Sequence, residues 1–339
     1  MKQAVMMEPG KIIYRDVPEP SAGKNEVKVK MKRIGICGSD IHVNHGRHPY
    51  TGYPVVQGHE VSAEVVEVGE GVTGVKPGDK VTIQPQVVCG ECYPCTHGQY
   101  NACLSLKVHG FQTTGMASDY FVENISKITK LPDNMSFDHG AMIEPIACGI
   151  HAIRRYGDVK EKSVLVLGGG PIGNLLAQSC KAMGAKNVLL SEISDYRLKV
   201  AEKCGLQGVN PRKKELKEAM FETFGSDGAD VIFECVGVNE TMTQAIEYSR
   251  KGSDIVVVGV FAKMANINLG FVQDKELRLI GTAMFREYAF NEAIELVEKG
   301  LIELDALITN HVPFDDFARA YSIIDEQMDK VMKVMVVID

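Results

Sequence analysis

Ser163-Val164-Leu165-Val166-Leu167-Gly168-Gly169-Gly170-Pro171-Ile172-Gly173 is the stretch that decides the fold of this 339-residue chain. Its first part is a short, almost continuously apolar run, which is typical of a strand buried in a parallel sheet. Residues 174–183 then follow a helical pattern that ends at Gly184. A strand, a glycine-rich turn and a helix in this order form the context in which G-x-G-x-x-G binds a dinucleotide.

Each glycine of the turn has its own physical reason. Gly168 allows the tight turn, Gly170 lets the backbone approach a pyrophosphate, and Gly173 lets the helix pack closely on the strand. Unpaired amides and the helix dipole favour an anion at the start of the helix. We therefore expect the cofactor-binding turn to consist of Gly168, Gly170, Pro171, Ile172 and Gly173.

An acidic residue ends the next apolar run. Glu192 closes the segment 187–192, at about the 20-residue distance where a carboxylate hydrogen-bonds the adenosine ribose. Because a carboxylate at this point repels a 2′-phosphate, we predict NAD as the cofactor rather than NADP. Arg197 lies close enough in sequence to accommodate a phosphate, so NADP stays open as the alternative.

The remainder of this half alternates between the two kinds of element. Segments 231–233, 255–258 and 277–280 have strand character, with helical stretches between them. Strands that alternate with helices predict a parallel, doubly wound sheet. Helical stretches at 291–299 and from Phe317 then precede an alternating, strand-like tail.

The first 151 residues have a different pattern. Segments 27–32 and 62–68 alternate apolar and polar side chains, a period that predicts half-buried antiparallel strands. Glycine and proline separate these short runs. We therefore predict a β-rich first domain in the form of a small barrel.

Two segments of the first domain carry metal-binding chemistry, namely Cys37-Gly38-Ser39-Asp40-Ile41-His42 and Gly58-His59-Glu60. Thiolate, imidazole and carboxylate are zinc ligands, and three protein ligands leave a coordination position for water or substrate. Ser39 and His42 follow the cysteine closely enough to pass a proton from an alcohol to solvent. Taken alone, Cys37 reads as a buried core residue. The combination of these residues instead indicates a catalytic zinc site.

A second cluster contains only cysteines. Cys89, Cys92 and Cys95 are each separated by two residues, and Cys103 follows eight positions after Cys95. This spacing lets a loop turn four thiolates onto one zinc ion, and a closed four-cysteine site has no position for substrate. Disulfides and accidental clustering are the alternatives. We predict a structural zinc site that orders the loop.

Glu144 lies in an apolar run, directly before Pro145. A carboxylate in such a run is costly to bury unless it is paired or binds a metal. Glu144 is therefore a candidate zinc ligand or a hydrogen-bond acceptor beside the metal. A structural salt bridge is the alternative.

Composition narrows the class of protein. The net charge is −7, and 45% of the residues are hydrophobic. No basic cluster indicates nucleic-acid or anionic-membrane binding, and no apolar run is long enough to span a bilayer. We expect a cytoplasmic protein, in which nine cysteines are free thiols or metal ligands.

Along nearly its whole length the chain resembles the zinc-dependent medium-chain alcohol and polyol dehydrogenases, nearest their sorbitol, threonine and sugar-acid branch. The resemblance rests on Gly35 to His42, Ile143-Glu144-Pro145, Gly149-Ile150-His151, the glycine-rich turn and Phe285-Arg286. It implies an α/β fold with a GroES-like β-barrel catalytic domain (1–151 and 286–339) and a doubly wound parallel, or Rossmann, NAD-binding domain (152–285). The tail after residue 331 would return to the first domain.

Site residues follow from the same resemblance. Catalytic zinc would be held by Cys37, His59 and either Glu60 or Glu144, with Ser39 and His42 as the proton relay. Structural zinc would be held by Cys89, Cys92, Cys95 and Cys103, and Arg286 would lie near the substrate. One residue departs from the family pattern, since Ala63 replaces the usual glycine three residues after Glu60. A Cβ there is harmless in a strand but not at positive φ.

The predicted reaction is hydride transfer from a secondary alcohol of a polyol or sugar acid to NAD, giving a ketose or keto-acid. One alternative is L-threonine 3-dehydrogenase, which would share every ligand and differ only in its substrate pocket. Another is an NAD-binding regulatory protein without catalysis. We also expect a homo-oligomer, from the resemblance and from the strand-like segments 255–260 and 267–269.

Overall fold

The computed structural model describes all residues, Met1–Asp339. The chain forms two compact units, one made of Met1–Glu144 with Ile308–Asp339 and the other of Pro145–Leu307. The domain boundaries predicted above differ slightly, because these units place 145–151 and 286–307 in the second unit. As functional domains, those boundaries stay a prediction. None of the helices combines the length and the apolar character that a membrane crossing requires.

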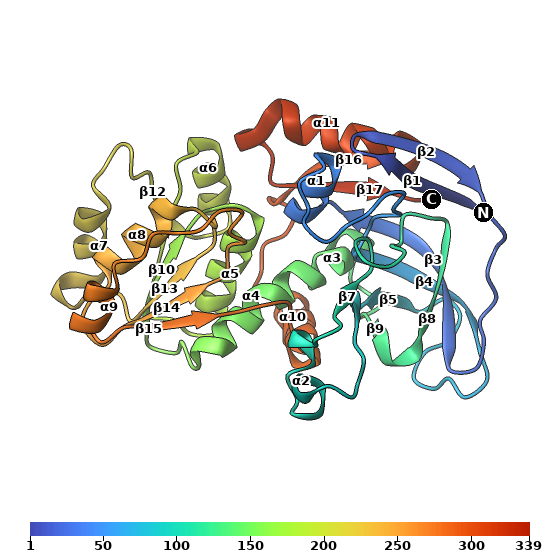
Figure 1. The fold of residues 1–339 in the computed structure, drawn as a ribbon, viewed down its shortest axis with the longest axis horizontal. Coiled ribbons are helices and arrows are strands. Elements are labelled where there is room, and N and C mark those ends of the chain that lie inside the picture. Colours follow the sequence, from blue (N-terminus) through green and yellow to red (C-terminus); the bar gives the residue numbers. More distant parts are fainter. The chain divides into compact units, whose positions relative to one another are not determined.

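The first unit is built on a mostly antiparallel sheet (Figure 1). Its strands have the order β16-β17-β3-β4-β5-β9, and β8 also pairs with β3. Two further two-stranded sheets are β1-β2 and β6-β7. The strands are β1 (Lys2–Glu8), β2 (Lys11–Asp16), β3 (Glu26–Gly35), β4 (Glu60–Val68), β5 (Lys80–Ile83), β6 (Gln86–Val87), β7 (Lys107–Val108), β8 (Tyr120–Asn124), β9 (Ile128–Lys130), β16 (Ile308–Pro313) and β17 (Lys333–Val337).

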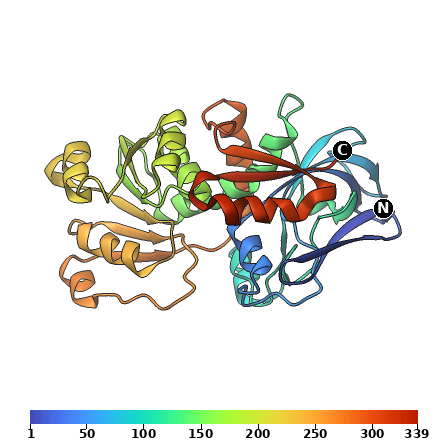
Figure 2. The ribbon, with the colours of Figure 1, turned by 90° about the horizontal axis from the view of Figure 1, so that it is seen from above.

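Short helices connect the strands of the first unit. They are α1 (Gly38–Asn44), α2 (Tyr93–Thr96), η1 (Tyr100–Ala102), η2 (Ile125–Lys127), α3 (Phe137–Ala141), η4 (Phe314–Asp316), α11 (Phe317–Gln327) and η5 (Met328–Lys330). Figure 2 shows α11 lying along β16 and β17, all coloured red. The predicted return of the chain is confirmed, because β17 pairs with β3 in the antiparallel direction.

The second unit is a six-stranded, fully parallel sheet with the order β12-β11-β10-β13-β14-β15. This is the strand order of a dinucleotide-binding Rossmann fold. The strands are β10 (Ser163–Leu167), β11 (Asn187–Ser191), β12 (Gln207–Val209), β13 (Val231–Glu234), β14 (Asp254–Val257) and β15 (Arg278–Gly281). The predicted α/β fold class is confirmed.

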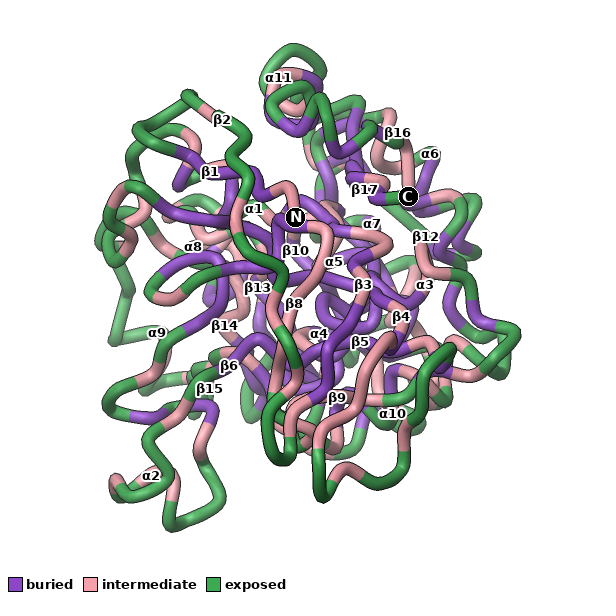
Figure 3. Tube along the Cα trace, turned by 90° about the vertical axis from the view of Figure 1, so that its right-hand side faces the viewer, coloured by how far each residue is buried: buried purple, intermediate pink, exposed green.

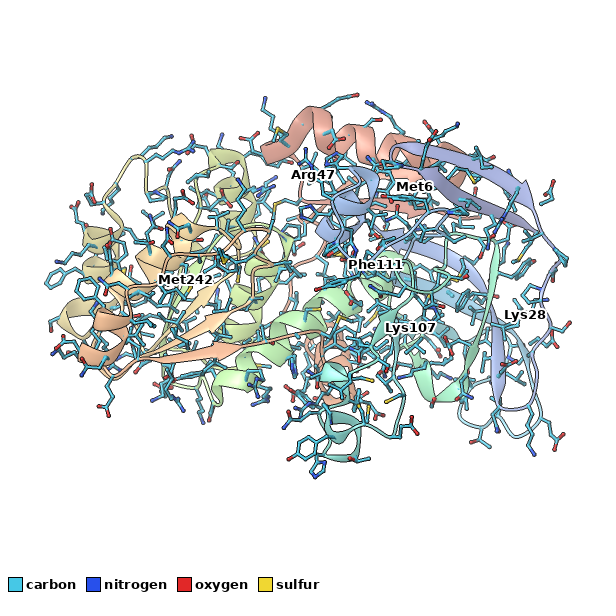
Figure 4. The ribbon with its side chains drawn as sticks, in the orientation of Figure 1. Met6, Lys28, Arg47, Lys107, Phe111 and Met242 are labelled. Atoms are coloured by element: carbon cyan, nitrogen blue, oxygen red, sulfur yellow. The ribbon has the colours of Figure 1, made fainter.

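Helices flank this parallel sheet. They are α4 (Ile143–Tyr156), which begins at the end of the first unit, α5 (Pro171–Ala182), α6 (Asp195–Lys203), α7 (Leu216–Phe224), η3 (Gly225–Asp227), α8 (Asn239–Tyr248), α9 (Leu269–Asp274) and α10 (Glu287–Glu298). Apolar side chains of α7 and α8, among them Met242, pack with β10 and β13 in one buried cluster. Figure 4 labels Met242 among these strands.

Burial follows the sequence patterns. The central strands β3, β4, β10 and β13 are mostly buried, and Figure 3 shows them largely in purple. One expectation was wrong, because 267–269 is not a strand and Leu269 begins α9. The Asn268 side chain accepts a hydrogen bond from Phe271 N and so caps that helix.

Candidate functional site

Cys37, His59 and Glu60 form a group in the first unit. One potential ligand atom from each lies within 4.8 Å of the others, and Glu144 is not a member of the group. His59 and Glu60 are buried, while Cys37 is half-buried. A thiolate, an imidazole and a carboxylate are a donor set that zinc takes, and three of them leave one position open.

Two turns bring the residues of this open metal group together. Strand β3 ends at Gly35, and Cys37 then serves as the N-cap of α1. His59 follows Gly58, whose φ is +97° and whose surroundings leave little room for a Cβ, because Ala117 N would lie 3.3 Å away. Glycine at position 58 therefore allows the chain to turn into β4 with the histidine and the glutamate at the start of the strand.

A buried carboxylate lies beside His59. Asp40 Oδ1 is 3.5 Å from His59 Nδ1, which has no hydrogen-bond partner of good geometry. Burial alone would lower the pKa of His59, but the charge of Asp40 raises it well above its usual value. Since Nδ1 faces the carboxylate, Nε2 is the ring nitrogen left for a metal. The carboxylate would then fix the tautomer of the ligand.

Glu60 has a buried cationic partner. Lys333 Nζ donates to Glu60 Oε2 at 2.5 Å and to the main-chain oxygen of Ile36 at 3.1 Å. Both charged side chains are nearly inaccessible to solvent. A buried charge needs such a partner. The ion pair with Lys333 therefore compensates the charge that Glu60 buries at the edge of the metal group.

Glu144 lies close to the same charges without joining the group. Burial raises its pKa to about 7, with a further contribution from Glu60, while His59 and Lys333 act in the opposite direction. Such a carboxyl carries a proton over part of the neutral range. Whether Glu60 or Glu144 binds zinc stays a prediction, although the geometry brings Glu60 nearer to the other two donors.

Ser39 and His42 both lie on α1. Residues at spacing i, i+3 share one face of a helix. Ser39 is half-buried and His42 is exposed. The structure has no hydrogen bond between their side chains, so their action as a relay stays a prediction.

Phe111 borders the open metal group on another side. Its ring lies 4.9 Å from the His59 ring and stacks on His48 at 4.7 Å, centroid to centroid. Figure 4 labels Phe111 in the first unit. A cavity of about 610 Å³ opens beside it, lined among others by Arg15 and Tyr50 but by no residue of the metal group. Phe111 therefore forms a wall between this cavity and His59.

The four predicted thiols also meet. Distances between sulfur atoms are 3.5 Å for Cys89 and Cys103, 3.8 Å for Cys92 and Cys103, and 4.0 Å for Cys89 and Cys95. Tetrahedral zinc with Zn–S bonds of about 2.3 Å places its sulfurs about 3.8 Å apart. The spacing of this thiol cluster therefore fits one zinc ion with no open position.

Backbone amides favour the thiolate form in the cluster. Cys89 N and Ser105 N donate to Cys103 Sγ, and Cys92 N donates to Cys89 Sγ. Hydrogen bonds from backbone amides, first that of Leu104, lower the pKa of Cys92 to about 6, whereas burial raises the pKa of Cys95 to about 12. None of the nine cysteines forms a disulfide. Zinc binds the thiolate form, so these amides support metal binding.

The glycine-rich turn lies in the second unit, between β10 and α5. Gly168 has φ +101°, and Gly170 is the N-cap of α5 with Pro171 at its first position. A Cβ on Gly173 would lie 1.9 Å from Gly168 O. Glycine is therefore required at 173 for the helix to pack on the turn, as predicted. The amides at the start of α5 are left for an anion.

Glu192 lies next to this turn. Its carboxylate accepts hydrogen bonds from Gly169 N and Ser194 N, both at 2.8 Å. Arg197 Nη1 lies 3.9 Å from Glu192 Oε2, and it is also the nearest atom to a Cβ built on Gly170. The two candidate determinants of cofactor choice, Glu192 and Arg197, therefore lie side by side.

Arg286 is the N-cap of α10 in the second unit. His151 lies near it and donates to or accepts from Tyr288 Oη at 2.7 Å. Burial, followed by the charges of Arg286 and Arg155, lowers the pKa of His151 to about 4. His151 is therefore neutral near pH 7 and places no further positive charge beside Arg286.

Three residues around the open metal group were not predicted from the sequence. Lys333, Gln57 and Tyr321 are all buried. A signal existed only for Lys333, since a lysine inside the apolar run 331–338 must be paired if that run is a buried strand. The concern about Ala63 is resolved, because Ala63 lies within β4 and has no positive φ.

Comparisons with known proteins agree with this geometry. The family "Alcohol dehydrogenase GroES-like domain" matches residues 23–133, and "Zinc-binding dehydrogenase" matches residues 171–299. Together these two matches include the thiol cluster, the open metal group, Glu192 and the last part of the glycine-rich motif, from Pro171 to Gly173.

Individual relatives cover almost the whole chain. Sorbitol dehydrogenase of Halalkalibacterium halodurans is 35% identical over 316 residues, which cover 92% of each chain. 2-Dehydro-3-deoxy-L-galactonate 5-dehydrogenase of Pseudoalteromonas atlantica is 34% identical over 307 residues, covering 90% of this chain and 89% of that protein. The solved structure of a zinc-binding type of dehydrogenase from Sinorhizobium meliloti, bound to NADP, has 31% identity and a TM-score of 0.89 and covers 99% of both chains. The chain therefore belongs to the zinc-dependent medium-chain polyol dehydrogenase family and is a zinc-containing alcohol or polyol dehydrogenase that uses a nicotinamide cofactor.

Proposed function

We propose that this enzyme oxidises a secondary alcohol of a polyol or sugar acid to the ketose or keto-acid, with NAD as the hydride acceptor. The observation that carries the proposal is the open group of Cys37, His59 and Glu60, which offers three zinc ligands and a fourth, free position. A site with four protein ligands would hold zinc without leaving a position for a substrate. A site with three protein ligands lets the substrate bind the metal directly, as a reaction requires.

Zinc and a nicotinamide cofactor would supply the chemistry that amino-acid side chains cannot. Zinc held by Cys37, His59 and Glu60 would supply a Lewis acid that lowers the pKa of an alcohol, and a nicotinamide bound to the second unit would supply the hydride acceptor. Support for the metal assignment comes from the donor set and from the Asp40 carboxylate beside His59. Glu144 is proposed as a carboxyl group beside this site.

The residues of α1 are proposed to move the proton. Ser39 Oγ accepts the proton of the substrate hydroxyl and passes its own proton to the imidazole of His42, which releases it to solvent. Helical spacing places the two side chains on one face, and His42 is the more exposed of the two. His42→Ala should therefore slow alcohol oxidation, while external imidazole buffer restores part of the rate.

The second unit is proposed to hold the cofactor. Gly168, Gly170, Pro171, Ile172 and Gly173 would receive the pyrophosphate at the start of α5, and Glu192 would accept hydrogen bonds from the adenosine ribose. Each oxygen of Glu192 holds one backbone amide, and a carboxylate oxygen has a second lone pair for a hydroxyl.

The preference for NAD or NADP depends on the neighbouring side chains Glu192 and Arg197. Glu192 disfavours a 2′-phosphate, whereas Arg197 could pair with one. We propose that the carboxylate decides and that kcat/KM is higher with NAD. Glu192→Ala should move the preference toward NADP by about tenfold or more, and Arg197→Ala in the same background should remove that gain. Equal or higher kcat/KM with NADP in the unaltered enzyme would contradict the proposal.

The substrate class is the most specific part of the proposal. Relatives named for sorbitol and for a deoxy sugar acid support a polyhydroxylated chain. Arg286 is proposed to contact it, because a guanidinium holds a carboxylate with two parallel hydrogen bonds. L-Threonine also carries a carboxylate, so its oxidation is the alternative.

An assay of NADH absorbance on neutral polyols, aldonates and L-threonine tests the proposal. Oxidation of a polyol or an aldonate is expected. Arg286→Ala should lower kcat/KM more for an aldonate than for a neutral polyol. Turnover of L-threonine alone would replace the polyol assignment, and no turnover of any alcohol would favour a regulatory NAD-binding protein.

The cellular compartment and the oligomeric state of the enzyme are also part of the proposal. We propose a cytoplasmic homo-oligomer, a dimer or a tetramer. Free thiols suited to zinc support a reducing compartment, and exposed apolar side chains of the second unit support association, namely Val260, Met264 and Leu269. Light scattering that shows a stable monomer would exclude the oligomer.

A further inference from the structure

A buried chain of hydrogen bonds runs from α11 to the carboxylate beside His59. Tyr321 Oη donates to Gln57 Oε1 at 2.7 Å, and Gln57 Nε2 donates to Asp40 Oδ1 at 3.1 Å. Asp40 Oδ1 in turn lies 3.5 Å from His59 Nδ1. None of these four residues exposes more than 4% of its surface. The chain therefore links the C-terminal helix to the open metal group without passing through solvent.

The direction of each hydrogen bond is fixed. Burial raises the pKa of Tyr321 well above its usual value, so its hydroxyl remains a donor. This hydroxyl points at Gln57 Oε1, which leaves the amide nitrogen facing two acceptors, Asp40 Oδ1 and, at 3.4 Å, Asp40 O. A reversed amide would place an oxygen against both acceptors. Tyr321 therefore selects the one orientation of Gln57 that supports Asp40.

Asp40 is held at both of its oxygens. Oδ2 accepts a hydrogen bond from Cys37 N at 2.9 Å. Oδ1 accepts a hydrogen bond from Gln57 Nε2 and lies 3.5 Å from His59 Nδ1. Rotation of the carboxylate away from the imidazole would break the bond to Gln57 and leave a buried amide without its acceptor, which is unfavourable.

We propose that Gln57 and Tyr321 are positioning residues, which hold the Asp40 carboxylate against His59 and through it set the orientation of the imidazole toward the metal. Partners of this kind behind a metal-binding histidine contribute to metal affinity although they never touch the ion. This inference rests on the proposed function, because it takes Cys37, His59 and Glu60 as the catalytic metal site.

Anchoring of α11 is the competing explanation, and the chain offers a matched control for it. Tyr14 Oη donates to Phe314 O at 2.6 Å and accepts from Phe317 N at 2.9 Å. Tyr14 therefore fastens the start of the same helix through its hydroxyl without reaching Asp40. Tyr321→Phe and Tyr14→Phe each remove one hydroxyl from the contacts of α11, and only the first breaks the chain to His59.

The test measures metal binding on the full-length enzyme. Zinc affinity of the open site is determined by competition with a chelating dye, and Co²⁺ placed in that site reports ligand geometry through its visible absorption. Tyr321→Phe should weaken zinc affinity by about tenfold and shift the cobalt bands. Tyr14→Phe should leave zinc affinity within about twofold of wild type and the cobalt bands unchanged.

A second variant covers the case in which Tyr321→Phe does not fold. Gln57→Met should cause a similar loss of zinc affinity, and the double variant should bind zinc no more weakly than Gln57→Met alone, because both residues act through one chain. The inference is overturned if Tyr321→Phe matches Tyr14→Phe, or if the two losses add in full. A wild-type enzyme without metal at the open site would overturn the proposed function as well. A zinc-loaded, active wild type with unaffected variants would overturn this inference alone.

Discussion

The two metal-binding groups of the first unit are built in opposite ways. The thiol cluster lies on one loop, 89–103, where Cys103 and Asn101 are the only buried residues. The open metal group is buried at His59 and Glu60 and draws partners from distant segments, since Lys333 pairs with Glu60 across 273 residues. We therefore expect the loop to depend on its metal for order, whereas the surrounding sheet would order the open group and leave its metal free for chemistry.

Loss of the closed site should have the largest effect on stability. Cys92→Ser removes one of four ligands from a loop that has almost no apolar core, and structural zinc contributes folding energy directly. We expect one zinc per chain instead of two and a fall of about 10 °C in the unfolding temperature of the first unit. Differential scanning calorimetry combined with elemental analysis measures both. Full thermal stability in this variant would refute the structural role.

The same substitution in the open group should separate activity from stability. Cys37→Ser removes a zinc ligand in a site that the sheet already holds in place, so kcat should fall by about 1,000-fold or more, a loss of about 4 kcal/mol of transition-state stabilisation. The unfolding temperature should change by only a few degrees. Steady-state NADH assays and thermal denaturation provide the two numbers. A large loss of stability with retained activity would assign a structural role, rather than a catalytic one, to the open metal group.

Removal of the buried Lys333 cation should destabilise the protein, because it leaves the charge of Glu60 uncompensated. Lys333→Met leaves Glu60 buried without its partner, which should cost about 3–5 kcal/mol of folding free energy. Lys213→Met is a matched control, because Lys213 pairs with Asp195 at the same distance of 2.5 Å while both side chains are more than half exposed, and an exposed pair contributes about 1 kcal/mol or less. Urea denaturation of both variants measures the difference. Equal losses of folding free energy in the two variants would show that burial does not make the Lys333–Glu60 pair more important than an exposed pair.

The smallest predicted difference concerns the two carboxyl groups. If Glu60 is the third ligand, Glu60→Gln should weaken zinc affinity of the open site by about 10-fold to 100-fold more than Glu144→Gln does. The reason is that a ligand contributes more than a carboxyl group outside the cluster. Competition with a chelating dye resolves the two variants. The reverse order would assign the ligand role to Glu144.

The two groups also differ in how far the sequence alone could predict them. The thiol cluster follows from local spacing, and the structure brings all four cysteines together. Cys37, His59 and Glu60 were recognisable by residue type and pattern, as was the glycine-rich turn with Glu192. Gln57 and Tyr321 were not, and Lys333 could be recognised only as a lysine that needs a partner, because the contacts of these residues depend on β17 pairing with β3 and on where α11 packs. No spacing along the chain encodes such contacts. The interpretation of 267–269 as a strand failed for a local reason, the cap at Asn268.

Zinc content before and after mild chelation tests the central claim most directly. Freshly prepared enzyme that has never met a chelator should contain two zinc ions per chain by elemental analysis. Brief exposure to a chelator of moderate affinity should remove the ion from the open group first, because it has three protein ligands rather than four thiolates. The account predicts one remaining zinc, lost activity, an almost unchanged unfolding temperature, and recovery of activity when Zn²⁺ is added back. One zinc or none in the untreated enzyme, or full activity after one zinc has been removed, would contradict it.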